Sequence, residues 1–154
     1  MPHIHLVTDL DAPPARAFDT SLDLDLEIRA GAPYGTRIAR RSERSGGIIA
    51  HGQTVTWQAR HFGLTWSHTS RITEHERPQR FVDEMDRGVF AEFRHEHTFE
   101  PLRGGRTRMI DDLHYRVPLG ALGRLAERLF VDARLRRLLQ ERNAEIAAAC
   151  RSAR

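Results

Sequence analysis

The chain has 154 residues, a formal net charge of +3 and one cysteine, Cys150. Its length predicts a single domain over residues 1–154, large enough for a complete hydrophobic core without disulfide bonds. No apolar run approaches the roughly 20 residues that cross a bilayer, which excludes a membrane-spanning helix. With no visible signal peptide and no possible internal disulfide, we expect a cytoplasmic protein.

The charge is unevenly distributed along the chain. Residues 1–30 carry a net charge of −4, whereas residues 121–154 carry +4. The two ends could lie against each other in one fold, or the basic end could bind nucleic acid or an anionic membrane surface. No nucleic-acid-binding motif accompanies the arginines, so we expect no nucleic-acid partner and do not favour a membrane partner.

The N-terminal part begins with a strand and two short helices. Apolar and polar residues alternate over His3–Leu10, which predicts a strand. The prolines of Ala12-Pro13-Pro14 favour the first turn of a helix, which we predict over Ala15–Leu22. A second short helix is predicted over Asp23–Ile28.

A strand over Tyr34–Ser42 and a turn at Ser45-Gly46-Gly47 precede a predicted β-hairpin, His51–Glu74. A two-residue turn at Phe62-Gly63 closes this hairpin. One face then carries aromatic residues and histidines, while the other carries threonine, glutamine and arginine, as a solvated face should. The pairs on the aromatic face are His61 with Leu64, Ala59 with Trp66, Trp57 with His68, and Val55 with Ser70.

Three further strands are predicted, over Arg80–Arg87, Phe90–Glu100 and Thr107–Val117. Gly104-Gly105 would suit a two-residue turn, but that register mixes aromatic and charged side chains on one face. Burial of a whole face outweighs a preference for one turn type, so we predict a loop of three or five residues centred on Gly104. The inward pairs are then Phe99 with Met109, His97 with Asp111, His95 with Leu113, and Phe93 with Tyr115.

The aromatic faces of the two hairpins predict a cavity. A sealed core face would be aliphatic and a surface face charged, whereas large aromatics mixed with histidines suit a pocket for a mainly apolar ligand. For the two tryptophans, the alternative is an ordinary place in the core. The predicted ligand-binding residues are Trp57, Trp66, His68, Met85, Phe93, His95, His97, Phe99, Met109, Asp111 and Tyr115.

Four of these residues are candidates for catalytic acid–base chemistry, namely His68, His95, His97 and Asp111. Asp111 should point inward, where an unpaired carboxylate is costly, so we predict that it pairs with His97 as the polar anchor of the cavity. His95 and His97 share one face of a strand, but zinc needs at least a third ligand, and we predict neither a metal site nor a cofactor. Asp112 should lie on the opposite, solvated face.

The residues from Leu122 to Cys150 predict a long helix with an irregularity. Its apolar residues form two stripes on nearly opposite sides, and a straight helix on one sheet cannot bury both. We therefore predict a bend or break within Val131–Arg134, with the first piece lying over the mouth of the cavity. One stripe comprises Leu122, Leu125, Ala126, Leu129 and Ala133, and the other comprises Leu135, Leu138, Leu139 and Ile146.

Several segments together carry a resemblance to one protein family. They are Ala12–Phe18 (APPARAF), Val55–Gly63 (VTWQARHFG), Phe81–Met85 with Arg87-Gly88, Arg94–Glu100 (RHEHTFE), Thr107–Asp112 (TRMIDD) and Val117–Gly120 (VPLG). In their order and spacing the chain resembles the bacterial cyclase/dehydrase-like proteins of the SRPBCC superfamily, which also contains the START and birch-pollen-allergen proteins.

The resemblance implies an α+β helix-grip fold, in which a curved antiparallel sheet wraps around a long C-terminal helix and two short helices follow the first strand. It also implies an internal cavity, so binding of a hydrophobic small molecule (lipid-like or polycyclic and polyketide-like) is the leading expectation. One alternative is a polyketide aromatase/cyclase that promotes dehydration or ring closure, although no set of residues matches an active site of that kind. The other is a peripheral lipid carrier. The sequence leaves the ligand, the oligomeric state and catalysis open.

Overall fold

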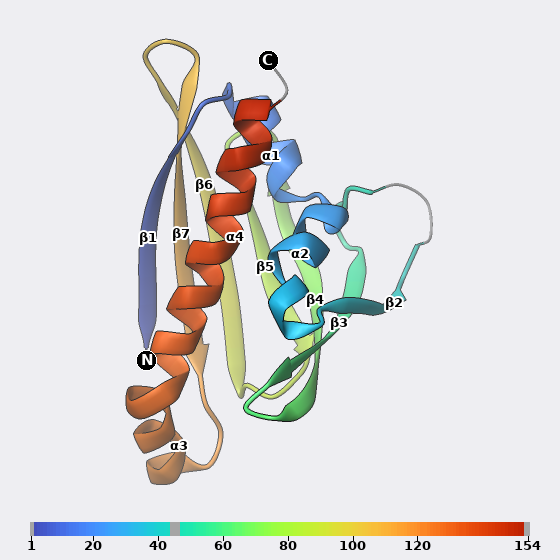
Figure 1. Cartoon of the computed structure of the whole chain (residues 1–154), viewed down its shortest axis with the longest axis vertical. Coiled ribbons are helices and arrows are strands. Elements are labelled where there is room, and N and C mark those ends of the chain that lie inside the picture. The colour runs from blue at the N-terminus through green and yellow to red at the C-terminus, as the bar shows by residue number, and fades with distance from the viewer. Residues whose placement is uncertain (1, 44–46, 153–154) are drawn as a thin grey trace.

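The computed structural model describes residues 2–43 and 47–152, and of the predicted turn at Ser45-Gly46-Gly47 only Gly47 lies within them. The described residues build one antiparallel sheet of seven strands in the order β1-β7-β6-β5-β4-β3-β2. Strand β1 pairs with β7, so two segments far apart in the sequence lie side by side (Figure 1). The strands are β1 (His3–Leu10), β2 (Arg37–Arg41), β3 (Thr54–His61), β4 (Leu64–Glu76), β5 (Arg80–Arg87), β6 (Glu92–Leu102) and β7 (Arg106–Arg116).

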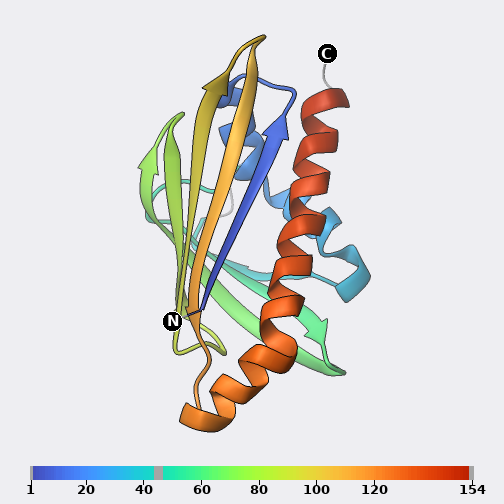
Figure 2. The same cartoon turned by 90° about the vertical axis from the view of Figure 1, so that its left-hand side faces the viewer.

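The helices cover one face of this sheet (Figures 1 and 2). Pro14 stands in the first turn of the first helix, and the Asp23 carboxylate accepts a 2.9 Å hydrogen bond from the Asp25 amide at the start of the second. The predicted first strand and two short helices are confirmed, and the long last helix against a curved sheet is the helix-grip fold. The helical segments are α1 (Pro14–Ser21), α2 (Leu24–Ala30), the 3₁₀ turn η1 (Ala32–Tyr34), α3 (Gly120–Ala126), the π-helical turn η2 (Glu127–Val131) and α4 (Asp132–Ser152).

Both predicted hairpin registers are confirmed. In the first hairpin Trp57 lies opposite His68, and the turn residues Phe62 and Gly63 both have positive φ, as a two-residue hairpin turn requires. In the second hairpin a three-residue loop, residues 103–105, joins Leu102 to Arg106. All four predicted inward pairs form there: Phe99 with Met109, His97 with Asp111, His95 with Leu113, and Phe93 with Tyr115.

The hydrophobic core lies between the inner face of the sheet and helices α1, α2 and α4. Phe18 of α1 contacts the rings of Phe81 and Phe99 at centroid distances of 5.4 Å. On the other side of this cluster, Ile146 and Cys150 of α4 are fully buried. Burial of an aromatic or large aliphatic side chain contributes about 1.5–3 kcal/mol, so this cluster fixes α1 and α4 on the sheet.

The C-terminal helical segment changes direction at η2, as Figure 2 shows. The irregularity lies just before the predicted segment Val131–Arg134 and shares only Val131 with it. A π-helical turn inserts an extra residue and so rotates the apolar stripe that precedes it away from the stripe that follows. Leu122 and Leu125 are accordingly 73% and 55% exposed. No helix of the described residues is long and apolar enough to span a membrane.

Candidate ligand-binding cavity

A cavity of about 590 Å³ lies between the inner face of the sheet and the helices. This volume falls within the range of roughly 300–1,000 Å³ that is typical of small-molecule sites. Strands β3 to β6, helix α2 and the first half of α4 supply most of its wall. Its apolar lining includes Leu22, Leu24, Ile49, Trp57, Trp66, Phe81, Phe90, Phe93, Leu113, Leu135, Leu138 and Leu139.

Five of the predicted ligand-binding residues line this cavity, namely Trp57, Trp66, His68, Phe93 and His95. The indole nitrogen of Trp66 donates a 2.8 Å hydrogen bond to the carbonyl of His61, which fixes the orientation of the ring. His68 contacts Phe93 edge-on at a centroid distance of 5.0 Å. Burial lowers the pKa of His68 to about 4, so its imidazole is neutral at pH 7.

Six predicted residues do not border the cavity, and the expectation that they line it is corrected. They are Met85, His97, Phe99, Met109, Asp111 and Tyr115. Met85 pairs with Ser70 of β4 and packs against Gly88. The other five point inward as predicted, but helices α1 and α4 cover that part of the sheet: Phe18 packs on Phe99, and the amide of Asn143 reaches Asp111. Helix packing over one half of the inner face therefore confines the cavity to the other half.

Asp111 is the centre of a buried polar cluster. Its Oδ1 atom accepts a 3.0 Å hydrogen bond from His95 Nε2, and its Oδ2 atom accepts one of 2.6 Å from Asn143. His97 Nδ1 also lies 2.9 Å from Oδ1 but lacks hydrogen-bond geometry. Burial alone would raise the pKa of Asp111, but the contacts with His95 and His97 outweigh it and hold the pKa well below the usual range. Asp111 is therefore an anion in the protein interior.

Of the two histidines that contact Asp111, His95 lines the cavity and His97 does not. His97 is only 1% exposed, and its ring stacks on Phe81 at a centroid distance of 4.2 Å. Burial, followed by the charge of His95, holds the pKa of His97 well below its usual range, so His97 is neutral. The predicted pairing of His97 with Asp111 is correct as register, but this pair, predicted as the anchor of the cavity, does not border it; the neighbouring His95 does.

Asp83 and Arg142, together with His95, form the polar floor of the cavity. Neither Asp83 nor Arg142 was predicted from the sequence as a site residue. Asp83 lies directly opposite His95 across β5 and β6, and its Oδ1 atom has no hydrogen-bond partner among the described residues. Burial raises the pKa of Asp83, and the charges of His95 and Arg142 oppose this only in part. The guanidinium of Arg142 donates to the Glu27 carboxylate and, at 2.8 Å, to the Ser21 carbonyl.

A signal for both missed residues exists in the sequence. Asp83 stands two residues after Phe81 in a strand, so its side chain shares the inner face. Arg142 follows Leu138 and precedes Ile146 at spacings of four, which places it within the buried stripe of the last helix.

The mouth of the cavity is formed by apolar residues from three connections. Phe62 is in the β3–β4 turn, Val89 follows β5, and Leu119 precedes α3, and all three are exposed. Beside them Arg134 lies 3.0 Å from His61 Nδ1 and within hydrogen-bonding reach of it. Burial, and then the charge of Arg134, lowers the pKa of His61.

One group of side chains beside the cavity could hold a metal ion. The ligand atoms of Asp83, His95 and His97 lie within 4.8 Å of one another. His95 is already engaged with Asp111, however, and His97 is sealed beneath Phe81. We therefore do not assign a metal ion to these three residues.

Comparison with known proteins places the chain in a family. The family described as polyketide cyclase/dehydrase and lipid transport matches residues 1–151. No curated protein matches the sequence significantly.

Solved structures with the same fold are distant in sequence. The protein TTHA0849 from Thermus thermophilus has a TM-score of 0.72 at 19% identity, and the match covers 96% of this chain and 99% of that one. A START superfamily protein from Mycobacterium smegmatis has a TM-score of 0.69 at 14% identity, with coverages of 96% and 98%. The ZhuI aromatase/cyclase from Streptomyces sp. R1128 has a TM-score of 0.68 at 15% identity, with coverages of 97% and 93%. At these identities the likeness shows the fold alone. Since the family match spans almost the whole chain, the protein belongs to the polyketide cyclase/dehydrase and lipid transport family of the SRPBCC superfamily.

Proposed function

We propose that the protein binds a mainly apolar small molecule in the 590 Å³ cavity, with one polar group of the ligand placed at the floor formed by Asp83, His95 and Arg142. The observation that carries this proposal is the asymmetry of the lining. Aromatic and aliphatic side chains surround most of the space, Asp83, His95 and Arg142 lie together at its floor, and His61 and Arg134 lie at its mouth. Such a lining suits a lipid-like or polycyclic body that bears a carbonyl or hydroxyl group.

The polar floor offers both a donor and an acceptor to the ligand. When the His95 ring carries one proton, on the Nε2 atom that donates to Asp111, its Nδ1 atom is an acceptor suited to a hydroxyl group. The raised pKa of Asp83 favours its protonated form, which can donate to a carbonyl oxygen. The apolar wall supplies affinity through burial, and the floor sets the orientation of the ligand.

Native mass spectrometry of freshly purified protein tests this proposal directly. We expect a mass above that of the polypeptide, or saturable quenching of tryptophan fluorescence when a polycyclic hydroxylated compound is added. Binding should weaken in Trp57→Ala and change its preference among polar substituents in His95→Gln. If no apolar compound alters the fluorescence of Trp57 and Trp66, the proposal is contradicted.

Acid–base catalysis of the aromatase/cyclase type is a second candidate function. It is favoured by the contiguous arrangement Asp111–His95–Asp83, in which a buried carboxylate orients an imidazole that faces a second carboxyl group. In this arrangement His95 would move the proton and Asp83 would act as the acid, while Asp111 would position His95. The solved relative named as an aromatase/cyclase supports this candidate as a likeness of fold. Turnover of a polyketide-like substrate that is lost in His95→Gln while binding is kept would establish it.

A peripheral lipid carrier is the third candidate, and the surface beside the mouth favours it. Exposed apolar side chains follow one another from the mouth along α3 and η2, with Arg124 and Arg128 interspersed. Such a segment can enter a headgroup region and attract anionic lipid. Binding to anionic vesicles that weakens with salt and is lost in Leu125→Glu would support the carrier, and absence of vesicle binding would exclude it. The exposed residues are Leu119, Leu122, Leu125, Leu129 and Phe130.

A further inference from the structure

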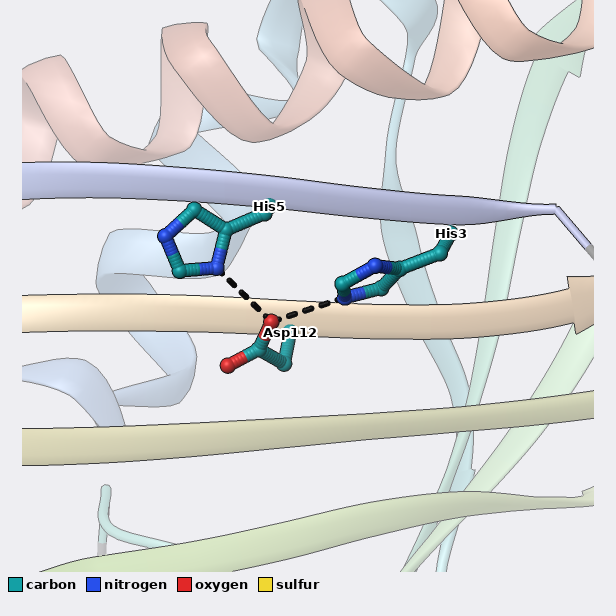
Figure 3. A group of neighbouring side chains, drawn as sticks. All are labelled: His3, His5 and Asp112. Atoms are coloured by element: carbon teal, nitrogen blue, oxygen red, sulfur yellow. Dashed lines mark hydrogen bonds and ion pairs between the residues drawn. The ribbon is translucent and has the colours of Figure 1, made fainter.

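A second cluster of histidines lies on the outer face of the sheet, away from the cavity. His3 and His5 of β1 both point to Asp112 of β7 (Figure 3). His3 Nε2 and His5 Nδ1 each lie 2.8 Å from the same oxygen atom, Oδ1 of Asp112. Two imidazoles from one strand therefore converge on a single carboxylate of its neighbour.

The backbone register produces this convergence. Residues two apart in a strand share a face, so His3 and His5 project together. The β1–β7 pairing then places Asp112 directly opposite His5, and His114 opposite His3. The ring of His114 stacks on that of His3 at a centroid distance of 4.3 Å and an interplanar angle of 4°, which holds the His3 ring in place.

We propose that His3, His5 and Asp112 bind a divalent transition-metal ion of the zinc class. The three donor atoms lie within 4.8 Å of one another, close to what bonds of about 2.0–2.2 Å to a shared ion require. Two imidazole nitrogens and one carboxylate oxygen suit Zn²⁺, Co²⁺, Ni²⁺ or Cu²⁺, whereas Mg²⁺ and Ca²⁺ prefer oxygen ligands. Each imidazole would bind through the nitrogen that now faces Asp112, with its proton on the other ring nitrogen.

The surroundings leave this site open to ions from solution. The side chains of His3, His5 and Asp112 are 42%, 53% and 33% exposed, so water can fill the remaining coordination positions. Glu96, the neighbour of Asp112 in β6, is held by Arg80 and Arg94 and does not compete as a ligand.

The expected effect is on the edge of the sheet. Strand β1 is an edge strand, and His3 is its first residue. A metal ion bonded to His3, His5 and Asp112 would tie the beginning of β1 to β7. Because such an ion binds the folded state, it should raise the melting temperature by about 5–10 °C at a concentration roughly 100-fold above its dissociation constant.

The test uses the full chain, freed of metal with a chelator and then dialysed. Addition of Co²⁺ should produce visible d–d absorption bands, Zn²⁺ should abolish them by competition, and calorimetry with Zn²⁺ should show one site. Ca²⁺ should give neither binding heat nor a change in melting temperature. In His5→Gln and in Asp112→Asn we expect the Co²⁺ bands to disappear and Zn²⁺ affinity to fall by at least about tenfold.

Asp9→Asn is the matched control, because Asp9 is an exposed carboxylate on the same face of β1 that pairs with Arg108 of β7. Its Zn²⁺ affinity should equal that of the parent protein. Equal affinity in Asp112→Asn and the parent would overturn the proposal. Bands that persist in Asp112→Asn but vanish in His95→Gln would also overturn it, since they would place the ion at Asp83, His95 and His97.

Discussion

Asp111 and Asp112 are adjacent in strand β7 and point to opposite faces of the sheet, and on its own face each contacts two histidines. His95 and His97 contact Asp111 inside the protein, and His3 and His5 contact Asp112 outside. The inner carboxylate is fully buried, whereas the outer one is one-third exposed. Two similar groups of side chains therefore occupy very different dielectric environments. Removal of the Asp111 charge should change the stability of the protein much more than removal of the Asp112 charge.

Asp111→Asn should destabilise the protein much more than Asp112→Asn. Loss of the buried charge leaves His95, His97 and Arg142 without the anion they surround, and such changes cost about 3–5 kcal/mol. Loss of the exposed charge should cost at most about 1 kcal/mol in metal-free buffer. Urea unfolding of the two variants measures both values. Equal losses would show that burial does not control the contribution of these carboxylates.

Acidification should destabilise the protein in two stages. The pKa values of His68 and His97 are below their usual value in the folded state, so between pH 6.5 and about 4 the unfolded chain binds more protons, and stability falls as the pH falls. His68 should account for about 1–3 kcal/mol of this loss. This is less than its full pKa shift would give, because the ring is only half-buried and one side of it faces the cavity. Below about pH 4, the lowered pKa of Asp111 adds a further loss in the same direction.

Unfolding by urea at a series of pH values between 7.5 and 4.5 tests this prediction. In His68→Gln the dependence on pH should be shallower than in the parent. A dependence on pH that is equally steep in His68→Gln and in the parent would contradict the assignment of a neutral, buried imidazole to His68, because the opposite contribution from the raised pKa of Asp83 is the same in both proteins.

Trp57→Ala and Trp66→Ala should alter the choice of ligand more than Arg60→Ala does. Both tryptophans line the cavity, so their truncation adds volume and removes a large apolar contact surface. Arg60 belongs to the same strand as Trp57, but it is exposed and does not line the cavity. Affinities for a series of apolar compounds of increasing size should shift toward larger members in the tryptophan variants. An unchanged order of affinities would mean that the tryptophans act only as core residues.

Gly123→Ala should disturb the entrance of the cavity. A Cβ atom at Gly123 would collide with the backbone carbonyl of Pro118, so the start of α3 must shift. We expect faster ligand exchange with little change in melting temperature, measured by stopped-flow fluorescence and by thermal unfolding. Ala121→Ser, at an exposed position of the same helix, should leave both quantities unchanged.

Much of the fold could be predicted because local turn chemistry and the burial of alternate residues agreed. At Phe62-Gly63 this agreement set the register, whereas around Gly104 the two disagreed and burial of the face that carries Phe99 and His97 decided it. The floor of the cavity was only partly predictable. The position of Asp83 at the floor depends on the pairing of β5 with β6, and that of Arg142 depends on where α4 crosses the sheet.

Two site assignments depended on contacts between distant parts of the sequence. Which inward histidine reaches the cavity depends on the coverage of β6 and β7 by α1 and α4, and the pattern of a strand carries no information about that coverage. Asp112 does point outward as predicted, but its partners His3 and His5 are more than 100 residues away in the sequence. The pairing of the first strand with the last was needed to find them.

The π-helical turn η2 separates two parts of the C-terminal segment that differ in how firmly they are held. After it, Tyr115 donates to Asp132 at 3.1 Å, and Leu139 and Ile146 are buried in the core. Before it, α3 presents Leu122 and Leu125 to solvent beside the mouth of the cavity. Movement of α3 would therefore open the mouth without breaking core contacts. The rate at which a bound molecule leaves and the temperature at which the protein unfolds should then respond to different substitutions, so that residence time can change while stability stays constant.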